Sequence, residues 1–136
     1  SAEAVTMLAP ETLKYTKSDE WVRLEGKNAT IGITEYAQGQ LSDIVFLEIT
    51  AAVGETVEKG AAVASIESVK AASEVYTPAR GVVQGVNESL PDKPETINSD
   101  PYGDGWVIQV ELSDPASLNE LMDAQAYTAY CEERSH

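Results

Sequence analysis

Short runs of alternating apolar and polar residues fill positions 21–110, and Gly, Pro, Asn or Asp interrupts them roughly every eight to twelve residues. Residues 20–24 and 29–33 both alternate in this way, and Glu25-Gly26-Lys27-Asn28 between them has the composition of a turn. We therefore expect these two segments to pair as a β-hairpin. Many short strands separated by turn residues predict an all-β core.

The pattern changes after this expected hairpin. Thr34 is placed to cap a short helix near 35–41, and the apolar residues 44–47 are expected to form the next strand. Two further segments, 53–60 and 81–86, each combine a short alternating piece with a pair of glycines. Their resemblance to each other suggests two hairpin-like halves folded against one another.

The chain between these two glycine-containing segments also has strand character. Residues 62–67 and 73–77 are rich in alternating and β-branched positions, so both are expected to be strands. The connection between them is then 68–72, with the sequence Ser-Val-Lys-Ala-Ala. This arrangement predicts that Lys70 lies at or near the tip of a hairpin.

The C-terminal third has a different character. Residues 90–105 are rich in Pro, Gly, Asn and Asp, which predicts a long ordered loop before a strand at 106–110. Ser113-Asp114-Pro115 then supplies a cap followed by a proline at the first helical position, and Asp123 is placed to cap a second helix. Helices are therefore expected near 115–133. The apolar face of the second helix is expected to contain Ala126, Tyr127, Tyr130 and Cys131.

Composition restricts the classes of partner. A chain of 136 residues with 43% hydrophobic content suits a single compact domain with one modest core. Its net charge of -14 would repel phosphate backbones and anionic membranes, so neither nucleic acid nor membrane is an expected partner. The acidity is explained equally well as a solubility device or as a means of steering partners, and charge alone does not decide between the two.

An enzymatic role finds little support in the residue types present. The only histidine is His136 at the C-terminus, so a histidine-based triad is not expected. The single cysteine, Cys131, falls on the expected apolar helix face and is interpreted as a core residue rather than a nucleophile; it also excludes an intrachain disulfide and fits a reducing compartment. No phosphate-binding loop or convergent set of metal ligands is evident.

Lys70 remains as the residue with candidate chemistry. A free lysine has a pKa near ~10.4 and is protonated at neutral pH, so a partner enzyme would have to acylate it. A hairpin tip would give that enzyme access to the amine and leave a finished arm free to rotate. Taken alone, however, a lysine in a turn is more often simply solvated.

The residues around Lys70 carry a wider resemblance. Ten positions resemble the biotinyl/lipoyl attachment domains, namely Gly54, Val57, Gly60, Ile66, Glu67, Lys70, Pro78, Gly81, Val82 and Val86. The match extends over about 13–133 to the H proteins of the glycine cleavage system, through segments 14–16, 20–21, 31–34, 67–73, 98–102 and 105–106. Biotin carriers usually have Met-Lys-Met and 2-oxo-acid dehydrogenase lipoyl domains Asp-Lys-Ala, so Ser68-Val69-Lys70 favours the H-protein branch.

This resemblance implies a mainly β fold, a barrel-sandwich hybrid, with lipoate in amide linkage to Lys70. The domain would span 13–133, with an N-terminal extension at 1–12 and a tail at 134–136. The residues expected to be recognised by the attaching enzyme are Glu67, Ser68, Val69, Ala71 and Ser73.

The resemblance also implies a monomeric carrier that is not itself an enzyme. Its lipoyl arm would take an aminomethyl group from glycine decarboxylase (P protein) to aminomethyltransferase (T protein), and reducing equivalents to dihydrolipoamide dehydrogenase (L protein). Lipoate-attaching and lipoyl-synthesising enzymes would be further partners. Two alternatives stay open: a carrier that relays lipoate or octanoate to 2-oxo-acid dehydrogenase lipoyl domains, and an unmodified β-domain acting as a binding module.

Two positions depart from the family pattern, since Asp19 and Tyr36 stand where the family often has histidine. The family is thought to shield its loaded arm in a surface cleft near the short helix, and Tyr36 is a candidate hydrogen-bonding wall of that cleft. The alternative is a tyrosine packed on the core with its hydroxyl in water. Segments 97–102 and 130–133 are more similar to plant-type members, so the expected location is the mitochondrial matrix after loss of a transit peptide, with the bacterial cytoplasm as the alternative.

Overall fold

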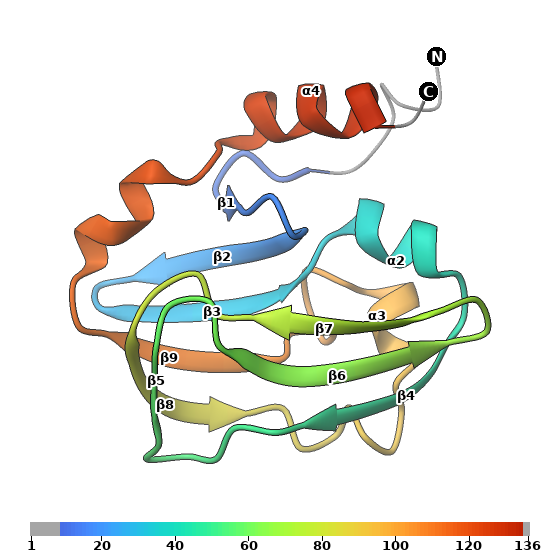
Figure 1. The fold of residues 1–136 in the computed structure, drawn as a ribbon, viewed down its shortest axis with the longest axis horizontal. Coiled ribbons are helices and arrows are strands. Elements are labelled where there is room, and N and C mark those ends of the chain that lie inside the picture. Colours follow the sequence, from blue (N-terminus) through green and yellow to red (C-terminus); the bar gives the residue numbers. More distant parts are fainter. Residues whose placement is uncertain (1–8, 135–136) are drawn as a thin grey trace.

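The structure is a computed structural model that describes residues 9–134 and consists of two antiparallel sheets with helices around their edges (Figure 1). The larger sheet has the order β1-β2-β3-β9-β8-β5 and the smaller has the order β4-β6-β7. The strands are β1 (Lys14–Tyr15), β2 (Glu20–Glu25), β3 (Asn28–Ile33), β4 (Ile44–Ile49), β5 (Thr56–Val57), β6 (Ala62–Ser68), β7 (Ala72–Tyr76), β8 (Gly81–Val86) and β9 (Ile108–Leu112). This arrangement confirms the expected mainly β, barrel-sandwich fold.

The main core lies between the two sheets. Buried side chains from the larger sheet, such as Val22 and Ile31, belong to one cluster with Leu47, Ile66 and Val75 from the smaller sheet. The period-two pattern of each strand directs these residues inward and leaves their neighbours on the outer faces. The alternation in the sequence therefore translates directly into a two-layer core.

The first expected hairpin is confirmed. Strands β2 and β3 pair from Glu20 opposite Ile33 to Glu25 opposite Asn28, and Gly26 in the turn has a positive φ of 66°. Trp21 lies opposite Gly32 in this ladder. A Cβ atom at position 32 would lie 2.6 Å from the indole, so only glycine admits the ring at this close approach.

The short helix is also confirmed as α2 (Glu35–Leu41). Thr34 caps it, because its Oγ1 accepts a hydrogen bond from the Ala37 N–H at 3.1 Å. The expected loop at 90–105 contains a single helical turn that the sequence did not predict, α3 (Thr96–Ser99). One turn is too short to produce a recognisable helical period.

The strand expected at 106–110 instead begins at Ile108 and ends at Leu112. The Asn87 side-chain amide donates hydrogen bonds to the carbonyls of Trp106, at 2.7 Å, and Asp104, at 2.9 Å. The carbonyls of Asp104 and Trp106 therefore accept hydrogen bonds from a side chain and do not require the backbone hydrogen bonds of a β-ladder. Propensity alone could not reveal this competition.

The C-terminal helices start where their caps predicted. Asp114 accepts from the Ala116 N–H at 3.1 Å and precedes η1 (Pro115–Glu120), which is a 3₁₀-helix. Asp123 accepts from the Ala126 N–H at 2.8 Å and precedes α4 (Ala124–Arg134). The expected place of Ala126 on the apolar face is wrong, because Ala126 is exposed. The buried positions of α4 are Ala124, Tyr127 and Cys131, spaced three and four apart.

Helix α4 covers a second, smaller cluster at the end of the larger sheet. Tyr127 stacks on Tyr15 with ring centroids 4.7 Å apart, and the backbone of Tyr15 bridges to Met122 just before α4. Trp21 and Tyr102 complete the aromatic part of this cluster. Two regions of the chain far apart in sequence therefore meet beside the start of β2.

Some expectations fall on residues that the structure does not describe. Residues 1–8 and 135–136, and with them His136, most of the expected extension at 1–12 and most of the expected tail at 134–136, lie outside the described residues. Within residues 9–134, no helix is long and apolar enough to cross a membrane. The same residues contain no group of three or more His, Cys, Asp or Glu side chains that could hold a metal ion.

Candidate functional site

Lys70 lies in the connection between β6 and β7, where the sequence placed it, and its side chain is exposed. The turn is closed by Ser68, whose N–H donates to the Ala71 carbonyl at 2.8 Å. The Ser68 Oγ accepts from the N–H groups of Lys70, at 3.1 Å, and Ala71, at 3.0 Å. A serine therefore organises the backbone on both sides of the lysine amide, as hydroxyl side chains commonly do in turns.

The tip is also attached to the rest of the molecule. The Val69 N–H donates to the Asp43 carbonyl at 3.0 Å, in the turn between α2 and β4. Asn98 of α3 holds that turn, since its Oδ1 accepts from the Ile44 N–H and its Nδ2 donates to the Ser42 carbonyl, both at 2.9 Å. Asn98 belongs to the segment 98–102 of the family resemblance, and the sequence predicts no structural role for it. Its contacts span more than fifty residues, which a local pattern cannot reveal.

The five residues expected to be recognised together with Lys70 all lie on this one hairpin. Val69 is 65% exposed, and Glu67, Ala71 and Ser73 are also exposed. Glu67 pairs with Ala72 in the ladder, and Ser73 pairs with Ile66. The hairpin therefore presents the lysine between accessible side chains on both strands.

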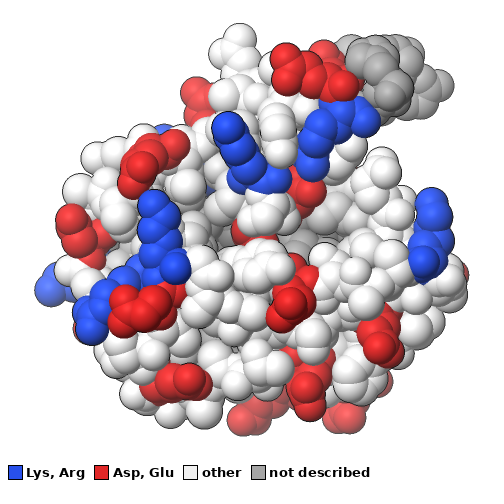
Figure 2. Space-filling view, in the orientation of Figure 1, with Lys and Arg blue, Asp and Glu red and all other residues white. Residues whose placement is uncertain are grey.

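A cleft of about 150 Å³ lies beside this hairpin, between α2 and the residues that precede β2. Figure 2 shows a hollow near the centre of the face in view, beneath the lobe that α4 forms, with basic side chains above it and acidic side chains beside and below it. The polar part of its lining includes Ser18, Asp19, Ser73 and Glu74. The apolar part includes Ile33, Leu41 and Ile66. Such a combination can exclude water from an apolar arm and favour a cationic group at its end.

Tyr36 is not one of the residues lining this cleft. Its half-buried ring packs against the aromatic cluster under α4, with the Arg134 guanidinium carbon 4.6 Å from the ring centroid. This position favours the packed alternative for Tyr36. A role as a wall of the cleft stays a prediction.

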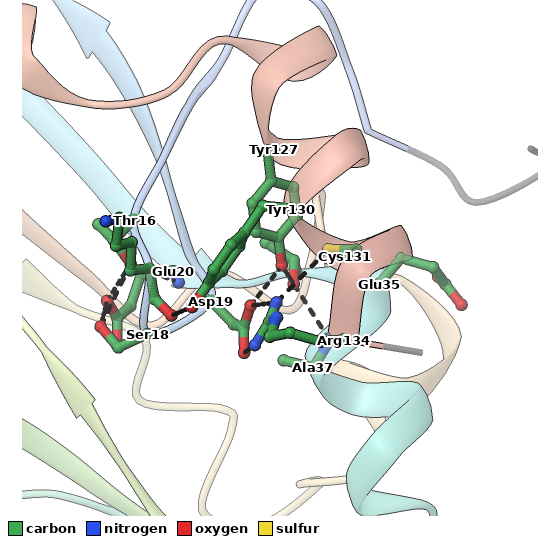
Figure 3. Close-up of polar contacts among 12 residues, drawn as sticks. Thr16, Ser18, Asp19, Glu20, Glu35, Ala37, Tyr127, Tyr130, Cys131 and Arg134 are labelled. Atoms are coloured by element: carbon green, nitrogen blue, oxygen red, sulfur yellow. Dashed lines mark hydrogen bonds and ion pairs between the residues drawn. The ribbon is translucent and has the colours of Figure 1, made fainter. Parts of the chain in front are cut away.

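Glu20, at the start of β2, is a buried carboxylate beside the cleft and is 1% exposed. One oxygen accepts hydrogen bonds from the hydroxyls of Thr16 and Ser18, the latter at 2.6 Å (Figure 3). The other oxygen accepts from the Tyr76 N–H at 3.2 Å, which connects β2 to the end of β7. Burial raises the pKa of Glu20 above its ordinary value, and the hydrogen bonds from Ser18, Thr16 and Tyr76 oppose this shift.

Asp19 lies on the rim of the cleft and adopts a left-handed backbone conformation with φ of 72°. Its carboxylate accepts from the Tyr127 hydroxyl at 2.7 Å and from two nitrogens of Arg134 at 2.6 and 3.1 Å (Figure 3). The hydrogen bond with Asp19 is the main reason that the pKa of Arg134 is raised. Tyr127 also lies within hydrogen-bond distance of the Thr34 hydroxyl, at 2.6 Å.

The sequence analysis missed Tyr127 and Arg134 as neighbours of Asp19. These residues are separated from Asp19 by 108 and 115 positions. The only available signal was a basic residue in the last turn of an amphipathic helix, which is common and carries no information about its partner. Cys131 is buried as expected, and burial raises the pKa of its thiol, so the core interpretation holds.

Comparisons with known proteins agree with this geometry. A family model described as "Glycine cleavage H-protein" matches residues 13–134. The chain is 52% identical over 118 residues to the glycine cleavage system H protein of Thermotoga maritima, which covers 87% of this chain and 94% of that protein. It is 51% identical over 128 residues to the same protein of Xanthomonas campestris pv. campestris, covering 93% and 97% respectively.

A solved structure is similar as well. The crystal structure of a glycine cleavage system H protein from Mycobacterium marinum matches with a TM-score of 0.79 and 33% sequence identity, over 93% of this chain and 99% of that chain. These relatives are all bacterial. The expected mitochondrial location and transit peptide therefore gain no support from them.

Proposed function

The chain belongs to the glycine cleavage H-protein family, whose members are lipoyl carriers and not catalysts, and we propose that its own lipoate is attached in amide linkage to Lys70. The observation that supports this assignment is the exposed position of Lys70 at a rigid hairpin tip. An attaching enzyme can reach its amine there. A free lysine is protonated at neutral pH, so an enzyme that removes the proton and supplies the acyl group must attach the lipoate.

The residues on the hairpin have distinct parts in this proposal. Ser68 fixes the turn through its hydrogen bonds to the backbone, so the attaching enzyme meets one conformation. Glu67, Val69, Ala71 and Ser73 are the accessible side chains that this enzyme would contact. Among them Val69 offers an exposed apolar side chain directly beside the lysine.

The cleft between α2 and β7 is the proposed resting place of the loaded arm. Ser73, on its rim, lies three positions along the chain from Lys70, roughly 10 Å at about 3.3 Å per residue. The apolar lining from Ile33 and Ile66 would exclude water, and Glu74 on the rim would favour a cationic aminomethyl group. The residues present therefore fit a long apolar arm with a basic end.

The partners of the family are the P, T and L proteins of glycine cleavage. For this chain we infer an aminomethyl group received from P protein and passed to T protein, with reducing equivalents passed to L protein, and lipoylation by separate attaching or lipoyl-synthesising enzymes. We further infer a single domain over 13–133 with residues 1–12 as an extension. Bacterial relatives are consistent with the cytoplasmic alternative for its location.

Lys70→Arg tests the proposal most directly, because arginine keeps the charge but cannot form the lipoyl amide. Lys27→Arg is a matched control, since Lys27 is also exposed in a hairpin turn, between β2 and β3. Protein produced with lipoate and its attaching enzyme is analysed by intact mass and by glycine-dependent NADH formation with P, T and L proteins. We expect complete loss of modification and activity for Lys70→Arg, and neither loss for Lys27→Arg.

Each other outcome identifies an alternative. Wild-type protein that stays unmodified under these conditions would indicate a binding module. Modified protein that supports no glycine-dependent NADH formation, but donates its lipoyl group to other lipoyl domains, would indicate a relay. Modification that persists in Lys70→Arg would place the attachment site elsewhere.

A further inference from the structure

The loop at 18–20 is held from one side by the last turn of α4. Arg134 binds the Asp19 carboxylate through two nitrogens, and Tyr127 donates its hydroxyl to the same carboxylate (Figure 3). The Asp19 carbonyl accepts from the Thr34 N–H at 3.0 Å, immediately before α2. Asp19 therefore connects α4, which contributes no residue to the lining of the cleft, with the start of α2, which lines it.

The backbone conformation of Asp19 is an uncommon one. Its φ of 72° lies in the left-handed region, which residues with a Cβ rarely adopt. The neighbours of Asp19 have a different environment, because Ser18 and Glu20 bond to each other and to Thr16 on the other side of the loop. Backbone hydrogen bonds from the Asp19 N–H to the Thr16 carbonyl, at 3.2 Å, and from the Thr16 N–H to the Glu20 carbonyl, at 3.0 Å, close this turn. The contacts to the Asp19 side chain add a second attachment, from α4, at this part of the cleft rim.

The Arg134–Asp19 pair is better organised than an ordinary surface ion pair. The Arg134 guanidinium lies over the rings of Tyr130 and Tyr36, at 4.0 and 4.6 Å from their centroids. The side chains of Arg134 and Asp19 are 30% and 18% exposed, whereas those of the Arg80–Glu58 pair are 54% and 70% exposed. Stacking and partial burial limit the orientations of the guanidinium before it binds the carboxylate.

The docking of α4 does not depend on this ion pair alone. Tyr127 stacks on Tyr15, and the backbones of Tyr15 and Met122 exchange hydrogen bonds at 2.8 and 3.0 Å. Ala124 and Cys131 are also buried beneath the helix. Removing the Arg134 charge should therefore leave α4 docked and release mainly the loop at 18–20.

From this arrangement we propose that Arg134 is a positioning residue for the arm cleft: through Asp19 it fixes the rim that protects the loaded arm from water. This inference rests on the proposed function of Lys70. It assigns the C-terminal helix, which lies outside the attachment hairpin, a part in keeping the cargo intact between partners.

The test compares Arg134→Gln and Arg134→Lys with the matched control Arg80→Gln, which removes an equivalent cation from the exposed pair with Glu58. The first measurement is spontaneous ammonium release from the isolated aminomethylated carrier. In that reaction water adds to the methylene carbon as its bond to sulfur breaks, and formaldehyde, ammonium and a free thiol result. The second is hydrogen exchange of the Glu20 and Thr34 amides in unmodified protein.

For Arg134→Gln we expect ammonium release and amide exchange to accelerate about fivefold, the factor for losing a well-organised, partly exposed ion pair worth about 1 kcal/mol. Arg134→Lys should retain part of the protection, because lysine keeps the positive charge. It cannot bind the Asp19 carboxylate through two nitrogens or stack on the tyrosine rings as the guanidinium does. Arg80→Gln should match the wild type in both measurements. Urea unfolding of each variant verifies that the fold is retained.

Two outcomes would overturn the inference. Faster amide exchange with unchanged ammonium release would show that Arg134 orders the loop without protecting the arm. Unchanged exchange would show that Arg134 does not position the loop. A wild-type carrier that cannot be lipoylated at Lys70 would instead refute the proposed function, and the exchange measurement would still decide whether α4 positions the loop.

Discussion

The hairpin tip at Lys70 and the corner around Asp19 and Glu20 lie on two sides of the same cleft but are built differently. The tip is organised mainly by hydrogen bonds from Ser68 that reach at most three residues, with one longer bond from the Val69 N–H to the Asp43 carbonyl, and most of its side chains are exposed. The corner combines short-range hydrogen bonds from Thr16 and Ser18 to Glu20 with contacts that span 56 to 115 residues, and Glu20 is completely enclosed. A site that a partner must recognise is local and accessible, whereas a site that must exclude water is assembled from distant segments.

The two regions also differ in how far their polar and charged groups are removed from water. At the corner, burial raises the pKa of Glu20. Next to it, the Asp19 carboxylate accepts hydrogen bonds from both the Tyr127 hydroxyl and the Arg134 guanidinium. Such a network is costly to assemble, because each polar group gives up water. At the tip, the hydroxyl and amide groups remain close to solvent. The predictions below test whether stability resides in the corner and partner recognition in the tip.

The largest difference should appear when a side chain is truncated in each region. Tyr127→Ala removes a buried ring stacked on Tyr15, together with its hydrogen bond to Asp19, and should lower the free energy of unfolding by about 3 to 5 kcal/mol. Val69→Ala at the tip should lower it by less than about 0.5 kcal/mol, because Val69 is 65% exposed. Urea unfolding of both variants measures the two values. Equal losses would mean that the tip is not an independent local structure.

The same contrast explains what the sequence predicted. The β2–β3 hairpin, the Thr34 cap and the tip position of Lys70 depend on residues close together in the chain, so their patterns were sufficient. The Asp19–Arg134 pair depends on how α4 packs on the larger sheet. No local pattern encodes that packing.

The errors within single elements have the same origin. The sequence predicts Ala126 on the apolar face of α4, but the contact with the aromatic cluster buries Ala124 instead. The start of β9 shifted to Ile108 because the distant Asn87 side chain binds the Trp106 carbonyl. In both cases a tertiary contact decided between local alternatives that the sequence left nearly equal.

The next prediction concerns the pH dependence of stability at the corner. Because the folded protein raises the pKa of Glu20 above its ordinary value of 4.5, its contribution to stability is fully present below about pH 4.5. That contribution is lost as the pH rises through the folded pKa, by at most about 1.4 kcal/mol per pH unit for one proton. Relative to Glu20→Gln, the wild type should therefore become less stable across this range.

Urea unfolding at several pH values between about 4 and 8 measures this difference. Glu111→Gln, at an exposed position on β9, controls for the loss of one negative charge. A wild type that instead gains stability over Glu20→Gln as the pH rises would show that the hydrogen bonds from Thr16, Ser18 and the Tyr76 amide outweigh the burial of the carboxylate. The corner would then behave as a site that favours the charged form.

Only a small change in stability is expected from Ser68→Ala, also at the tip. This substitution removes the hydroxyl that accepts from the Lys70 and Ala71 amides, but water can replace it at this exposed turn, so the loss should be about 0.5 to 1 kcal/mol. The effect on recognition should be greater, with lipoylation of Lys70 slowed several-fold, because the attaching enzyme must order the turn itself. Ser68→Thr, which keeps the hydroxyl, should restore most of the rate, and Ser65→Ala on the same strand should leave it unchanged. A normal lipoylation rate in Ser68→Ala would show that the enzyme reads the side chains of the hairpin and not its preformed backbone.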